Sequence, residues 1–201
     1  MKHAFWGIGL CLIFFVSGVH AADTNTDKAK KELAKAEKQL VEGNFDKMYE
    51  AAKKAQSLDA SLAASYAFSG LYLYRLEQSG PAEQEFQKAL TRDTNMGMAH
   101  IYLGNLFFDR GDSDRALDEW NVGARLEDSN PEALSSLALG LFLIGKTTEA
   151  TQQYKKALMY DRRYYQPQFL GDRKKGAAWS KKKIDAVAPL LQKVEKPGFP
   201  Y

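Results

Sequence analysis

The chain has 201 residues and a formal net charge of +3, from 28 basic and 25 acidic side chains. Its single cysteine, Cys11, excludes an intramolecular disulfide, so the fold must be held together by packing. Beyond residue 21 the only histidine is His100, which excludes Cys-His catalysis and a His/Cys zinc site from that part of the chain. We expect no catalytic residue, no metal and no cofactor.

The first 21 residues are typical of a secretory signal peptide. Lys2 supplies a positive charge, an apolar run extends from Ala4 to Val16, and small residues ending at Ala21 suit cleavage. We therefore expect an exported protein located in the periplasm, with residues 22–28 as a flexible leader. The alternative is an uncleaved membrane anchor, although the apolar run is shorter than the roughly 20 residues that a spanning helix needs.

Residues 29–164 repeat with a period of 34 residues and without insertions, as units 29–62, 63–96, 97–130 and 131–164. Each unit is predicted to form two helices, which in the third unit cover 99–110 and 115–126. Small residues recur in column eight of the period, and aromatic residues in column twenty-four of every unit but the first: Ala36, Gly70, Gly104, Ala138; and Ala52, Phe86, Trp120, Tyr154. Such a period predicts stacked helical hairpins, because one hairpin cannot bury its apolar face alone.

This pattern resembles the tetratricopeptide repeat. The third and fourth units carry its signature most fully, in these residues: Leu103, Gly104, Phe107, Gly111, Ala116, Trp120; and Leu137, Ala138, Gly145, Ala150, Tyr154, Ala157. The first unit is the weakest, with Met48 and Ala52 where Ala and an aromatic residue are usual. The resemblance implies an all-α fold, a right-handed solenoid of helical hairpins with a C-terminal capping helix, and a protein that binds other proteins without catalysis.

The second unit departs from the others at its turn. Glu77 stands where they have a glycine, and Ser79-Gly80-Pro81 follows three residues later. We therefore expect the second helix of this unit to start late, with Pro81 in its first turn.

In tetratricopeptide proteins the first helices of successive units line a concave groove, through columns two, five, nine, twelve and thirteen. The resemblance makes the following residues candidates for contact with a partner: Leu71, Tyr74, Arg75, Ile101, Asn105, Phe108, Leu139 and Phe142. Some members bind peptide carboxylates through Lys and Asn in columns five and nine, but this chain has only Asn105 there. The mainly apolar lining favours an apolar helix or extended peptide as partner.

Two alternatives to a partner-binding groove remain open. The aromatic residues of column twelve also serve to hold neighbouring units together. Residues 165–196 have an apolar face of their own and are predicted to form a helical cap, with a kink or restart at Pro189. This capping segment can fold back and fill the groove, whereas residues 197–201 are expected to be a flexible tail.

The predicted cap is also basic, through Arg173, Lys174, Lys175, Lys181, Lys182 and Lys183. Interleaved with aromatic residues, these side chains suit an anionic lipid or glycan surface, and their alternative role is a solvated cap surface. Nucleic acid is not expected as a partner of an exported protein. The sequence thus predicts a non-enzymatic interaction scaffold of the bacterial cell envelope that binds an apolar peptide or helix in its groove. The alternative is an envelope surface-binding protein acting through the basic C-terminal residues.

Overall fold

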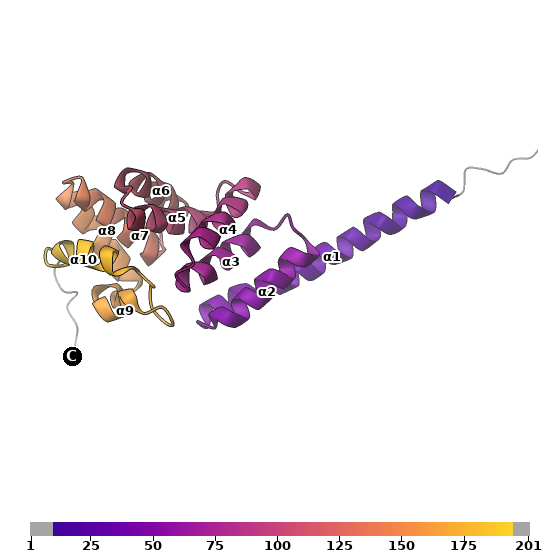
Figure 1. Ribbon diagram of the computed structural model, residues 1–201, viewed down its shortest axis with the longest axis horizontal. Coiled ribbons are helices and arrows are strands. Elements are labelled where there is room, and N and C mark those ends of the chain that lie inside the picture. Colours follow the sequence, from indigo (N-terminus) through magenta and orange to yellow (C-terminus); the bar gives the residue numbers. More distant parts are fainter. Residues whose placement is uncertain (1–9, 195–201) are drawn as a thin grey trace, which may run out of the picture.

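The computed structural model of the protein describes residues 10–194, with side chains from residue 24 onward. The regular secondary structure of the described part is all helical and forms a row of helical hairpins, with the first helix extending well beyond the row (Figure 1). In chain order the elements are α1 (Leu10–Val41), α2 (Phe45–Leu58), α3 (Ala63–Arg75), α4 (Ser79–Arg92), α5 (Gly97–Arg110), α6 (Ser113–Leu126), α7 (Pro131–Leu143), α8 (Thr147–Tyr160), η1 (Arg162–Tyr165), α9 (Pro167–Gly171) and α10 (Lys181–Leu191).

The hairpins keep the 34-residue phase of the sequence. The second helices begin at Phe45, Ser79, Ser113 and Thr147, and α3, α5 and α7 begin at the first residues of units two, three and four. Small residues let the two helices of a hairpin approach each other, because a Cβ added to Gly104 would lie 2.5 Å from the Trp120 ring. The predicted all-α solenoid of helical hairpins is therefore confirmed.

The turn inside each hairpin requires a left-handed backbone. Gly43, Gly111 and Gly145 supply it with φ angles of 73°, 94° and 82°, and Glu77 adopts the same conformation at 61°. As a result α4 begins at Ser79, in phase with the other second helices, and not late as the sequence suggested. Pro81 does lie in its first turn, as expected.

Helix α1 is longer than the sequence predicted. The flexible leader expected at residues 22–28 is wrong, because these residues are part of one continuous helix, and the Thr26 hydroxyl donates a hydrogen bond to Asp59 at 2.9 Å. Residues 1–9 of the predicted signal peptide lie outside the described residues. Over residues 10–194, no helix is both long and apolar enough to cross a membrane.

Residues 162–194, here called the C-terminal segment, turn back along the array. Helix α10 contacts α5, α7 and α8, so it lies beside the third and fourth units (Figure 1). The predicted cap is thus two short helices and a turn. Pro189 lies inside the last turn of α10 without a restart, and the predicted tail 197–201 lies outside the described residues.

Candidate functional site

The first helices α3, α5 and α7 form the face on which the C-terminal segment lies, here called the first-helix face. Of the eight predicted groove residues, Phe142 is partly buried. The other seven are buried on this face or between units: Leu71, Tyr74, Arg75, Ile101, Asn105, Phe108 and Leu139. The sequence left open that residues 165–196 fold back onto the groove, and the structure has this arrangement for residues 165–194.

The structure gives six of the predicted groove residues two different roles, while Leu139 and Phe142 pack in the main hydrophobic core. Leu71 packs with the core of the first two units, and Ile101 packs against Ala124 and Ala133 between units three and four. These two side chains therefore hold the array together. The residues whose side chains or carbonyl oxygens contact the C-terminal segment directly are Tyr74, Arg75, Asn105 and Phe108.

A buried carboxylate, Glu132 at the start of α7, is the centre of the contact between array and C-terminal segment. The Trp179 indole N–H donates to both of its oxygens at 2.8 and 2.7 Å, and the Tyr164 hydroxyl donates at 3.0 Å. The Asn105 amide donates at 3.1 Å from the neighbouring unit. With these donors the Glu132 side chain, only 5 % exposed, is fully paired.

Lys183 completes this network from the first turn of α10. Its ammonium nitrogen lies 2.6 Å from Asn105 Oδ1, 2.7 Å from Ser136 Oγ and 3.0 Å from Glu132 Oε1. The side chain is 1 % exposed, and burial lowers the pKa of the ammonium group, an effect that the negative charge of Glu132 opposes. A buried ion pair of this kind fixes one arrangement of the segment, because either charge alone would be costly to bury.

Two further residues of the predicted basic surface, Arg173 and Lys182, contact the repeats. Arg173 pairs with Glu77 at 2.8 Å and donates to the Tyr74 carbonyl at the end of α3. Lys182 donates to the Phe108 carbonyl at 2.6 Å, near the end of α5. Both cations thereby satisfy carbonyl groups at helix C-termini.

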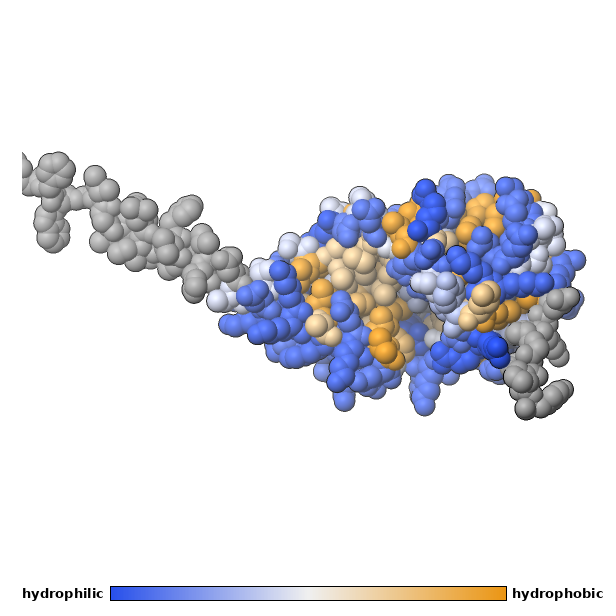
Figure 2. Space-filling view, turned by 180° about the vertical axis from the view of Figure 1, so that it is seen from behind, coloured by the Kyte–Doolittle hydropathy of each residue, from blue (hydrophilic) through white to orange (hydrophobic). Residues whose placement is uncertain are grey.

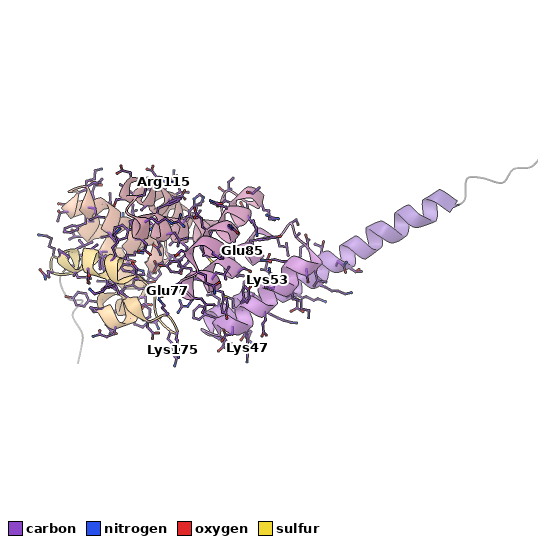
Figure 3. The ribbon with its side chains drawn as sticks, in the orientation of Figure 1. Lys47, Lys53, Glu77, Glu85, Arg115 and Lys175 are labelled. Carbon is purple, nitrogen blue, oxygen red and sulfur yellow. The ribbon has the colours of Figure 1, made fainter. Side chains whose placement is uncertain are left out.

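Four lysines of the predicted basic set remain exposed, although one of them, Lys182, bonds to the Phe108 carbonyl: Lys174, Lys175, Lys181 and Lys182. Figure 3 shows Lys175 at the turn that precedes α10, pointing away from the repeats. The buried Lys183 is not part of any surface, which corrects its assignment to a surface contact.

The turn before α10 is tightly built. The Asp172 carboxylate accepts hydrogen bonds from the backbone N–H groups of Lys174 and Lys175, which lower the pKa of that carboxyl. A Cβ at Gly176 would collide with the Phe169 carbonyl oxygen. The Gly176 carbonyl in turn accepts a hydrogen bond from Arg75 at 3.1 Å, so this turn is anchored on the second unit.

Solved structures place this architecture among known folds, whereas no protein-family model and no curated protein matches the chain. YrrB, described as a TPR protein with an unusual peptide-binding site, is 19 % identical with a TM-score of 0.51, and the match covers 87 % of this chain and 90 % of that one. The chain has the tetratricopeptide-repeat fold. PilF of Pseudomonas aeruginosa is 18 % identical with a TM-score of 0.57, and the match covers 85 % of this chain and 70 % of that one. MamA of Desulfovibrio magneticus RS-1, from its residue 41 to its end, is also 18 % identical, with a TM-score of 0.50 and coverage of 83 % of this chain and 94 % of that one.

Within this tetratricopeptide array, the sequence reasoning missed Glu132 and Ser136. Glu132 occupies column two of its unit, a groove column in the family, where the other units have Lys30, Ala64 and Met98. An acidic residue in a column that lines the groove in the family could therefore have been recognised from the sequence. Its partner Lys183 was read as one of a surface cluster, since sequence alone does not show which lysine of Lys181 to Lys183 points inward.

Arg75 and its neighbour Tyr74 are buried side chains of the first-helix face with unused hydrogen-bond capacity, at the Arg75 guanidinium and the Tyr74 hydroxyl. The Arg75 guanidinium stacks 3.6 Å above the centre of the Phe45 ring, while Nε and Nη2 have no partner. Burial lowers the pKa of this group. The guanidinium thus holds the turn at Gly176 against the first two tetratricopeptide units at some cost in desolvation.

Proposed function

We propose that the protein is a non-enzymatic interaction scaffold of the bacterial cell envelope, whose first-helix face binds a segment of a partner protein. One observation carries this proposal: the face already holds a polypeptide segment, by means of charged, aromatic and backbone contacts. Such contacts are those that protein–peptide interfaces use, and here they come from the chain itself. The partner segment takes the place of the C-terminal segment when it binds.

The first unit leaves an open end of this face at which a partner can start to bind. Column nine is buried in units two to four, yet its counterpart Glu37 is exposed, and Val41 is 88 % exposed. Apolar surface is also visible on the repeats next to the part of α1 that packs against them (Figure 2). A partner that first contacts unit one can then displace the segment from the neighbouring units, since the two compete for one surface.

The peptide-binding site named for YrrB supports this proposal by analogy of fold alone. The envelope location is part of the proposal because residues 1–21 have the pattern of a secretory signal. Binding to an anionic lipid or glycan has less support, since Lys183 is buried and Arg173 and Lys182 donate hydrogen bonds to carbonyl groups of the repeats.

Photo-crosslinking in intact cells tests the proposal. A photoreactive residue is placed at Glu37, on α1 at the open end of the first-helix face, or at Lys53, on the second helix of the same unit; both positions are exposed. We expect a discrete covalent adduct with an envelope protein from position 37 and none, or a different one, from position 53. Equal adducts from both positions, or none from either, would contradict binding through the first-helix face.

A further inference from the structure

We propose that units three and four carry a pocket that recognises a lysine ammonium group, and that the partner segment presents a lysine four residues after an aromatic residue. The inference rests on the proposed function and names the chemistry of the partner. It is drawn from the C-terminal segment, which occupies the pocket with Lys183 and Trp179 and so acts as an internal copy of the ligand.

The walls of the pocket come from the repeats and not from the segment. Three oxygen atoms surround the ammonium group, from Asn105 on α5 and from Glu132 and Ser136 on α7. The Trp120 ring closes the pocket, with its centre 5.2 Å from the Lys183 ammonium nitrogen. The repeats therefore supply one negative charge, two neutral acceptors and an aromatic face.

This set of groups suits lysine better than other side chains. An ammonium group has three donors, which match the three acceptors, whereas the wide planar fork of arginine needs acceptors side by side. The pocket is also oriented in advance. The Trp120 indole donates to Asn105 Oδ1 at 2.9 Å, and the Asn105 amide donates to Glu132, so both acceptors keep their positions.

The aromatic residue of the ligand is bound by the same carboxylate, that of Glu132. Trp179 donates its indole N–H to both Glu132 oxygens, and its ring lies 3.9 Å from the Lys183 ammonium group. The two ligand residues therefore contact Glu132 and each other at once. A spacing of four residues brings them to one side of the segment, next to a carboxylate that accepts from both.

The internal copy explains why an external ligand has to compete. A tethered segment acts at an effective concentration on the order of mM, so it weakens the apparent affinity of any peptide supplied from solution. A substitution that loosens the segment but leaves the pocket walls intact should therefore strengthen binding of an added peptide. Trp179→Ala is such a change, and Gly176→Ala is a second one that leaves both anchoring side chains in place.

The experiment uses the full chain and a fluorescein-labelled peptide of residues 176–192, with binding followed by fluorescence anisotropy. We expect the Trp179→Ala and Gly176→Ala proteins to bind this peptide at least about tenfold more tightly than the wild type does. A peptide with Lys183→Met should bind about 100-fold more weakly to these opened proteins, because the pocket then buries Glu132 without its cation. The matched control is a Lys181→Met peptide, whose side chain is 85 % exposed in the segment, and it should bind unchanged.

The outcomes separate the two proposals. When the residue at position 183 of the peptide is varied, Lys should give a higher affinity than Arg, Met or Glu. When the residue at position 179 is varied, aromatic residues should give the highest affinity. Tight binding that is indifferent to the residue at position 183 would overturn the lysine pocket and leave the scaffold proposal intact. If both opened proteins keep the circular dichroism spectrum of the wild type and bind none of the peptides, the lysine pocket and peptide binding by the first-helix face fail together.

Discussion

Replacing Lys183 with methionine should cost much more stability than its place in a lysine-rich stretch suggests. Removing one partner of a buried ion pair destabilises a protein by about 3–5 kcal/mol. Glu132 keeps donors from Trp179, Tyr164 and Asn105, so we expect the lower end, about 3 kcal/mol, which is a factor of roughly 150 in the unfolding equilibrium. The loss has an upper limit, because the C-terminal segment can detach before the array unfolds.

Two measurements check this expectation. Urea unfolding followed by circular dichroism gives the free energy of unfolding, and hydrogen exchange at residues 177–191 reports detachment of the segment. The matched control is Lys181→Met, which removes an exposed pair with Asp185 at 2.6 Å and should cost less than about 0.5 kcal/mol. If the two variants differ by less than about 0.5 kcal/mol in stability and exchange alike, the reasoning from burial is refuted.

Three further substitutions probe the array. Gly104→Ala places a Cβ 2.5 Å from the Trp120 ring and should cost about 1–3 kcal/mol in urea unfolding, whereas an unchanged midpoint would mean that the ring moves freely. Glu77→Gly relieves a left-handed backbone and should stabilise by about 0.5–1 kcal/mol; a loss instead would show that its exposed ion pair dominates. The Glu119 carboxylate, 2.6 Å away, raises the pKa of His100, so this pair stabilises the fold below the ordinary pKa of about 6.5 and loses that effect as pH rises through the folded value. The stability difference between wild type and His100→Gln should then be larger at pH 5.5 than at pH 9, and an equal or reversed difference would show that the pair contributes nothing.

The period of the sequence was sufficient to predict the hairpins because each unit is specified locally. Glycine turns, small residues in column eight and large ones in column twenty-four recur at fixed spacing, and each acts within one unit or on its neighbour. Glu77 shows the limit of such reasoning. Its neighbours force a non-glycine residue into the left-handed region, and residue preference alone predicts a later helix start.

The site was less predictable because it is made by contacts distant in sequence. Lys183 reaches Asn105 across 78 positions and Arg75 reaches Gly176 across 101, and no periodicity encodes either pairing. Column analysis assigned the apolar residues of the first helices to a partner, whereas the structure covers this face with the C-terminal segment, because burial by another part of the same chain leaves the same pattern. The acidic residue in column two was the one local sign of the contacts that this face makes with the C-terminal segment.

The hydrogen bonds of the C-terminal segment join units two, three and four, which changes how the array should unfold. In a linear array each unit contacts only its neighbours, so unfolding can spread from either end one unit at a time. Contacts that span about half the chain should make units two, three and four unfold together. They should also slow the folding of these units, because distant parts of the chain must meet first. The hairpin of α1 and α2 should then open as a separate unit of lower stability, while units two to four behave as one cooperative body as long as the C-terminal segment is bound to them.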